Sequence, residues 1–183
     1  MTDPLDPALD DGAFRAALGR FASGVTVVST VHEGVDHAMT ASAFCSVSMS
    51  PALVLVCVDR TNRFHDAALA SGTWGVSILS EPAAGSASWF ARRGRPLQDQ
   101  FDVAPHHRGP ATGTCLLDEA QAWLECRTWR ADDGGDHTIL IGEVLRAATR
   151  EPDPSPLLYY RSHYGSLVRS TASEKDRGSM GSA

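Results

Sequence analysis

Short runs of β-branched and apolar residues, each closed by glycine or polar residues, limit the fold of this chain more than any other feature. Residues 25–31 (VTVVSTV), 52–58 (ALVLVCV) and 74–79 (WGVSIL) have the length and composition of strands. The run at 52–58 is apolar at every position, which predicts a strand covered on both faces. A sheet with several such strands is therefore expected.

The second half of the chain has the pattern of a long hairpin. Strands are predicted at 120–130 and 137–148, and residues 132–135 (DDGG) have the turn chemistry that joins antiparallel neighbours. The glycine- and proline-rich stretch 93–114 is predicted to be a long surface loop. Only three short helices are expected, at 10–21, 63–71 and 84–92.

These elements predict a mainly β fold, an antiparallel barrel rather than a doubly wound sheet. The sequence contains no G-x-G-x-x-G after a strand and no G-x-x-x-x-G-K-[ST]. A dinucleotide, if one is bound, is therefore not expected to be held in the Rossmann manner.

Length and charge indicate one domain and exclude one class of partner. The chain has 183 residues with 43% hydrophobic content, enough for a single core, and we expect the domain to span 11–168. Residues 1–10 are expected to be a flexible N-terminus and 169–183 a disordered tail. A net charge of −6 offers no surface for a phosphate backbone, so no nucleic-acid partner is predicted.

The cysteines and the hydropathy pattern favour the cytoplasm. Four cysteines are widely spaced, so free thiols are expected rather than disulfides or a metal site. Neither a secretory signal nor an apolar stretch long enough for a membrane span is visible. His106 and His107 are adjacent and would point apart, so no metal is predicted there.

Five motifs in one order carry a family resemblance. Together they resemble the flavin reductase-like proteins of the split-barrel flavin-binding fold, and the resemblance covers about residues 11–168. The motifs are GVTVV at 24–28, AMTASAF at 38–44, the strand and turn at 51–62, GDH at 135–137 and LLYYR at 157–161.

The resemblance implies a fold and an activity. The fold is a six-stranded antiparallel Greek-key split barrel with a few flanking helices, paired as a homodimer. The activity is NAD(P)H:flavin oxidoreduction, in which a hydride passes from NADH or NADPH to N5 of FAD or FMN and reduced flavin goes to a separate flavin-dependent monooxygenase. Two alternatives stay open: a split-barrel protein that keeps its flavin and acts on another small molecule, and a flavin-binding module without catalysis.

The predicted flavin site combines three kinds of residue. The small residues at 39–44 let backbone N–H groups approach a flat ring, and the turn at 59–63 offers donors at a helix start that suit a phosphate. By resemblance the turn holds the flavin phosphate, and other residues lie under or beside the ring; for each residue the structural alternative is ordinary packing or helix capping. The full set is Met39, Thr40, Ala41, Ser42, Ala43, Phe44, Cys57, Val58, Asp59, Thr61, Asn62, Arg63 and Phe90.

The resemblance also implies a nicotinamide side of the site, formed by His137, Tyr160 and Arg161. The alternative is a surface histidine and a barrel-rim tyrosine beside a solvated arginine. No obligatory acid or base is assigned, because hydride transfer needs alignment of two rings more than proton chemistry. Relatives often carry a basic residue where Trp89 stands and an asparagine where Ser77 stands, which places the detailed contacts in question.

Overall fold

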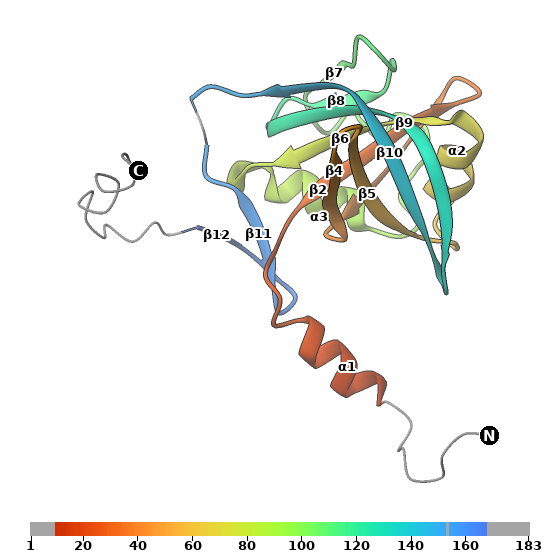
Figure 1. The fold of residues 1–183 in the computed structure, drawn as a ribbon. Helices are drawn as coiled ribbons and strands as arrows, with labels where there is room; N and C mark the ends of the chain where they lie inside the picture. The colour runs from red at the N-terminus through yellow and green to blue at the C-terminus, as the bar shows by residue number, and fades with distance from the viewer. Residues whose placement is uncertain (1–9, 153, 168–183) are drawn as a thin grey trace, which may run out of the picture.

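A seven-stranded antiparallel sheet forms the body of the molecule (Figure 1). The computed structural model describes residues 10–152 and 154–167. Every pairing in the sheet is antiparallel. In spatial order the strands are β3 (Val35–Ala41), β2 (Thr26–His32), β6 (Thr73–Leu79), β9 (Ala120–Gly134), β10 (His137–Thr149), β5 (Ala52–Asp59) and β4 (Phe44–Met49).

This architecture confirms the mainly β prediction but not the strand count. The main sheet has seven strands, and within the described residues no ladder joins its edge strands β3 and β4. Five further strands are short: β1 (Ser23–Gly24), β11 (Leu157–Tyr160) and β12 (His163–Ser166) form a small sheet, and β7 (His106–Arg108) pairs with β8 (Cys115–Leu117).

Three α-helices flank the strands, and their ends follow from local chemistry. The side chain of Asp10 caps α1 (Asp11–Leu18), and that of Asn62 caps α2 (Arg63–Ser71) by accepting from the backbone N–H of Phe64. The α3 helix (Ala84–Ala91) continues from a short 3₁₀ turn, η1 (Glu81–Ala83). In Figure 1, α1 extends away from the sheet, and none of its residues is buried.

Two clusters of buried side chains form the core. One lies between β2, β5, β6 and α2 and includes Val28, Val56, Phe64 and Trp74; the other lies toward α3 and includes Phe90 and Leu117. Thr26–Thr30 of β2 are all buried, and because neighbouring residues of a strand face opposite sides, Val27 joins one cluster and Val28 the other.

The apolar strand β5 corrects the expectation that both of its faces are covered. Val54, Val56 and Val58 are buried, whereas the intervening Leu55 and Cys57 are half-exposed. The second face is apolar because it forms the wall of a cavity, described below.

The stretch predicted to be a long surface loop, residues 93–114, is mostly exposed as expected, but it also packs against the sheet, and we call it the strap. It contains β7 and inserts Arg95, Gln100 and Phe101 into buried positions. The side chains of Arg95 and Gln100 donate to the backbone carbonyls of Ala38 and Asp36 on the edge strand β3. Its glycines and charges gave it the composition of a loop, but these contacts fix it against the sheet.

The hairpin turn is shorter than predicted. His137 pairs directly with Gly134, so the loop is only Gly135 and Asp136, and Asp133 lies within β9. Gly135 has φ of 78°, as the first central residue of a two-residue turn of this kind requires.

The sequence also predicts a flexible N-terminus over 1–10 and a disordered tail over 169–183. Apart from Asp10, both segments lie outside the described residues. Among the helices that are described, none combines the length and apolarity needed to cross a membrane.

Gly142 on β10 lets the side chain of Trp74 pack closely against the backbone, and we expect Gly142→Ala to destabilise the protein. A methyl group there would overlap the indole of Trp74 and meet Cβ of Cys126 at 3.0 Å. Overpacking of this kind should cost about 1–3 kcal/mol of unfolding free energy. Gly85→Ala on α3 is the matched control, because a Cβ there meets nothing within 4 Å and alanine favours a helix. Urea unfolding of both variants measures the difference, and equal stabilities would contradict the expectation.

Candidate functional site

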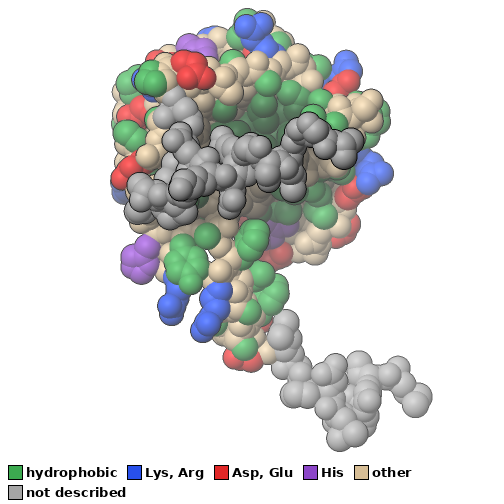
Figure 2. Space-filling view, turned by 60° about the vertical axis from the view of Figure 1, so that its left-hand side comes forward, with side chains coloured by type: hydrophobic (Ala, Val, Ile, Leu, Met, Phe, Trp, Pro, Cys, Tyr) green, Lys and Arg blue, Asp and Glu red, His purple; other side chains and the backbone are tan. Residues whose placement is uncertain are grey.

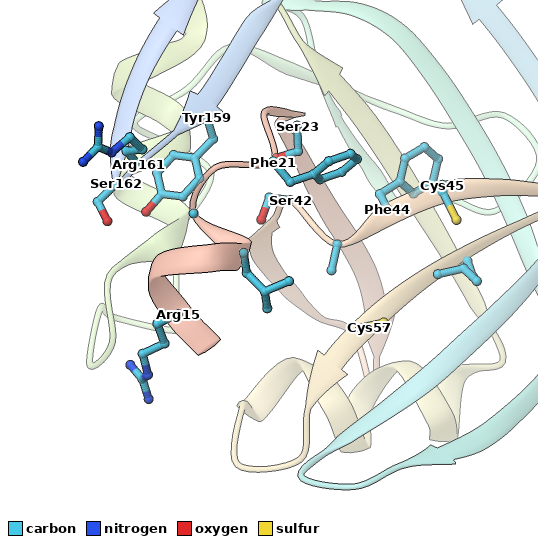
Figure 3. A pocket seen from close by; sticks show the side chains of 14 residues that line it. Arg15, Phe21, Ser23, Ser42, Phe44, Cys45, Cys57, Tyr159, Arg161 and Ser162 are labelled. Atoms are coloured by element: carbon cyan, nitrogen blue, oxygen red, sulfur yellow. The ribbon is translucent and has the colours of Figure 1, made fainter. Parts of the chain in front are cut away.

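A cavity of about 620 Å³ opens between α1, the strands β4 and β5, and the turn after β11 (Figure 3). Its volume lies in the range of small-molecule sites. Its lining residues are Arg15, Leu18, Gly19, Phe21, Ser23, Ser42, Ala43, Phe44, Cys45, Leu55, Cys57, Tyr159, Arg161 and Ser162. We call it the ring cavity, because its walls suit a flat apolar ligand.

The walls of the ring cavity come from the edge of the main sheet. Leu55 and Cys57 present the half-exposed face of β5, and Phe44 begins the neighbouring strand β4. Ser42 and Ala43 lie between β3 and β4, outside both strands, and the carbonyl of Ala43 accepts from the N–H of Cys57 at 3.0 Å. Small residues at this break expose backbone that a planar ligand can approach closely.

The two cysteines of this cavity differ in environment. Cys45 is exposed, whereas Cys57 is half-buried. Burial raises the pKa of the Cys57 thiol, and the neighbouring Cys45 adds to this effect. The Cys57 side chain therefore stays neutral and contributes an apolar surface.

A second pocket, of about 270 Å³, lies at the start of α2. It is lined by Thr61, Asn62, Phe90, Ala91, Gly94 and four arginines. We call it the arginine pocket after Arg63, Arg92, Arg93 and Arg95. The guanidinium groups and the N-terminus of α2 both favour an anion here.

A third, smaller cavity borders both the ring cavity and the arginine pocket. It has a volume of about 190 Å³, shares Ser42 and Tyr159 with the ring cavity, and shares Ala91 with the arginine pocket. Thr40 also lines it, and its hydroxyl donates to the carbonyl of Ala87 at 2.7 Å. The ring cavity, with its apolar walls, and the cationic arginine pocket therefore each border the same small cavity.

Arg95 is the structural centre of the arginine pocket. It is only 9% exposed, and its guanidinium donates to the carbonyls of Phe90 and Arg92 at 2.9 and 3.1 Å and to Oε1 of Gln100 at 3.1 Å. Burial lowers its pKa to about 10, with a further contribution from the charge of Arg63. The group is therefore still charged at neutral pH, although no carboxylate is among its partners.

Arg63, predicted to contact the phosphate, lines the arginine pocket and also bonds to the loop beside it. Its guanidinium donates to the carbonyls of Arg95 at 2.8 Å and Pro96 at 3.3 Å. These bonds hold the loop that carries Arg92 and Arg93 against the start of α2. Arg63 thus positions the pocket as well as adding charge to it.

Asp59 organises the turn before α2. Its Oδ1 accepts from the backbone N–H of Thr61 at 2.8 Å and from the Thr61 hydroxyl at 2.7 Å, and its Oδ2 pairs with Nη2 of Arg93 at 3.1 Å. The two Thr61 hydrogen bonds, and then the charges of Arg93 and His137, lower the pKa of this carboxyl. Asp59 is therefore ionised and already bonded to donors at the pocket.

Four of the residues predicted to contact the flavin have buried side chains. Met39 and Ala41 are buried in the core beneath β3, and Val58 faces the core from β5. Phe90 is 1% exposed and packs against Phe101, with ring centroids 4.9 Å apart, so only its edge reaches the arginine pocket. Met39, Ala41 and Val58 could therefore touch a bound ligand only through backbone atoms.

The predicted nicotinamide residues are only partly brought together. Arg161 lines the ring cavity, but along β11 the side chain that joins it is Tyr159 rather than Tyr160. Strand alternation explains this, because neighbouring residues face opposite sides. His137 lies opposite Asp59 in the β5–β10 pairing, and its Nδ1 is 2.7 Å from Asp136.

Phe21 is a lining residue that sequence reasoning placed in a helix instead. The α1 helix ends at Leu18, and Phe21 follows it with 78% of its surface exposed. Figure 3 shows Phe21 and Phe44 among the side chains that line the cavity. A phenylalanine three residues beyond a helix end, with no core to enter, was the available signal.

No metal chemistry is indicated in the part of the chain that the structure describes. Within it, no group of three or more His, Cys, Asp or Glu side chains could hold a metal ion. The site defined so far combines an apolar-walled cavity with a cationic pocket on an antiparallel β scaffold.

Comparisons with known proteins identify the family. Residues 18–168 match the model of the flavin reductase like domain. The chain is 40% identical over 166 residues to a flavin reductase (NADH) of Kitasatospora aureofaciens, covering 88% of this chain and 85% of the relative. It is also 40% identical over 163 residues to the reductase component of a 4-nitrophenol 4-monooxygenase/4-nitrocatechol 2-monooxygenase of Rhodococcus opacus, covering 87% and 83%.

Solved structures agree. The flavin reductase component of a bacterial two-component tryptophan halogenase is 39% identical, with a TM-score of 0.82 and coverage of 88% of this chain and 100% of that one. An NADH:FAD oxidoreductase of Streptomyces globisporus, solved in complex with NAD and FAD fragments, gives a TM-score of 0.84 at 35% identity, with coverage of 93% and 99%. The chain belongs to the flavin reductase-like family.

Proposed function

We propose that this chain is an NADH-dependent flavin reductase that supplies reduced flavin to a separate monooxygenase. The observation that carries the proposal is the combination of the apolar ring cavity with the cationic arginine pocket, each of which shares lining residues with the same small cavity. FMN and FAD have the matching chemistry, a flat ring joined by a polar chain to phosphate. The relatives named as NADH-dependent reductases and as monooxygenase reductase components support the choice of hydride donor and partner.

The residues present fit such a ligand. The apolar face of β5 and Phe44 would hold the ring, and the backbone at Ser42 and Ala43 would donate toward its polar edge. Thr61, Asn62, Arg92 and Arg93 would hold the phosphate. When bound, the flavin supplies the hydride acceptor, and the role of the protein is to align the two rings and exclude water.

Free flavin as a substrate is the feature that separates this proposal from its alternatives. NADH oxidation should be slow without added flavin and should saturate with excess FAD or FMN. Turnover that needs no added flavin but a different acceptor would indicate a protein that keeps its flavin, and no oxidation under any condition would indicate a binding module. Steady-state oxidation with FAD, FMN and riboflavin in turn tests this.

We also propose that the protein works in the cytoplasm, because all four cysteines are free, as a reducing compartment favours.

We further propose that the protein is a split-barrel homodimer, and we expect light scattering to give the mass of a dimer. On α1 and just after it, Phe14 is 48%, Leu18 57% and Phe21 78% exposed, and the helix projecting from the body in Figure 2 carries hydrophobic side chains on its surface. A second copy would cover this surface. A stable 19.5 kDa monomer would contradict the dimer.

His137→Ala should weaken the use of NADH more than the binding of flavin. His137 lies at the end of β10 and is not among the residues that line the ring cavity. Losing one hydrogen bond to the dinucleotide would raise the KM for NADH about 2- to 10-fold. The KM values for NADH and for FAD, measured separately, test this. A loss confined to flavin would place His137 on the other side of the site.

A further inference from the structure

Two residues that line the arginine pocket already donate to a carboxylate of the protein. Thr61 directs both its backbone N–H and its hydroxyl to Oδ1 of Asp59, and Arg93 directs a guanidinium N–H to Oδ2 of the same carboxylate. Both donor residues line the arginine pocket, whereas Asp59 does not. An internal carboxylate therefore occupies donors that a ligand phosphate would use.

The other arginines of the pocket do not share this feature. Arg63 and Arg95 bond to neutral acceptors, mainly backbone carbonyls, and Arg92 lies over the ring of Trp89 at 5.6 Å. Arg93 is the arginine of this pocket that forms an ion pair with a carboxylate in the described structure, and its side chain is 87% exposed. It is thus free to exchange one anion for another.

We propose that Asp59 competes with the flavin phosphate for Thr61 and Arg93, and so weakens the hold on flavin enough to make it an exchangeable substrate. The inference rests on the proposed function and deepens it. A phosphate monoester carries a charge of about −1.5 to −2 at neutral pH, so it both repels Asp59 and offers Arg93 a stronger partner. Binding must break or weaken the Asp59 bonds, and the cost of doing so lowers affinity. Release of reduced flavin is correspondingly faster.

Riboflavin provides the discriminating ligand, because it has the ring but no phosphate. Asp59→Asn removes the charge and keeps an oxygen that can accept from Thr61. The variant should bind FMN and FAD about 5- to 10-fold more tightly, as expected for one unit charge removed near a phosphate at a partly exposed site. Riboflavin affinity should not change. Asp59→Ser, which also lacks the charge, should give the same order of affinities.

Asp133→Asn is the matched control. Asp133, near the end of β9, is likewise a carboxylate that accepts from a backbone N–H and pairs with an arginine: it accepts from Gly135 at 2.8 Å and pairs with Arg60 at 3.1 Å, and it does not line the pocket. Its removal makes the same change in net charge without freeing Thr61 or Arg93. All flavins should bind to it as to the wild type.

Titration of flavin fluorescence gives the dissociation constants, and stopped-flow displacement gives the dissociation rates. The proposal expects tighter FMN binding and slower FMN release in both Asp59 variants only. Unchanged or weaker FMN binding with unchanged riboflavin binding would overturn it, because Asp59 would then support the phosphate site. Equal affinity of the Asp59→Asn variant for FMN and riboflavin would also overturn it, while leaving flavin reduction intact. A wild type that binds no flavin would instead reject the proposed function.

Discussion

Replacing Arg92 and Arg93 together by alanine should raise the KM for FMN and FAD about 10- to 150-fold and leave riboflavin reduction near wild type. Both side chains line the arginine pocket from the end of α3, and neither is buried. The range corresponds to a loss of about 1.5–3 kcal/mol for charge-assisted hydrogen bonds, with exposure favouring its lower end. Steady-state kinetics with the three flavins measure the effect.

Riboflavin is the internal control in that experiment. An equal loss for all three flavins would indicate a damaged ring cavity or a folding defect. No loss for any of them would move the phosphate away from this pocket. Arg63→Ala should give a smaller discrimination than the double variant, because Arg63 bonds to the carbonyls of Arg95 and Pro96.

Arg95→Ala should be the most destabilising of the arginine substitutions. The buried guanidinium bonds to the carbonyls of Phe90, Arg92 and Ala38, and its loss leaves those acceptors unpaired inside the protein. We expect a loss of about 2–4 kcal/mol, or roughly 5–15 °C in Tm for a chain of this size.

Arg127→Ala is the comparison for that variant. Arg127 pairs with Glu143 at 2.6 Å, but its side chain is 63% exposed, so its removal should cost less than about 1 kcal/mol. Thermal unfolding of both variants gives the contrast. A similar Tm for the two would show that the Arg95 bonds contribute little to stability.

Much of the fold follows from local patterns. The predicted helix at 63–71 coincides with α2, because an Asn cap and a following glycine with φ of 70° define both ends. The packing of the strap at 93–114 could not be predicted in the same way. It depends on Arg95 and Gln100, which donate to carbonyls of β3 that lie 57 and 64 residues away in sequence. Composition reports local preference and contains no signal for such contacts.

The sequence predicts site residues well where they share one turn. It predicts them less well where the face of a strand determines which side chain reaches the cavity. Thr61, Asn62 and Arg63 do share one pocket, as their position between a strand and a helix indicates. The choice between Tyr159 and Tyr160 depends on which face of β11 meets the cavity, and pattern alone does not define that face. The apolar run of β5 predicts a strand buried on both faces, because the wall of a cavity and the core of a protein are equally apolar.

The contacts of the strap with β3 also bear on how the protein avoids aggregation. An edge strand with free backbone groups is a template for pairing with strands of other molecules. Here the carbonyls of Asp36 and Ala38 accept from Gln100 and Arg95, so side chains of the same molecule take the place of a foreign strand. A substitution that frees the strap would expose that edge, and its consequence would be self-association through β3.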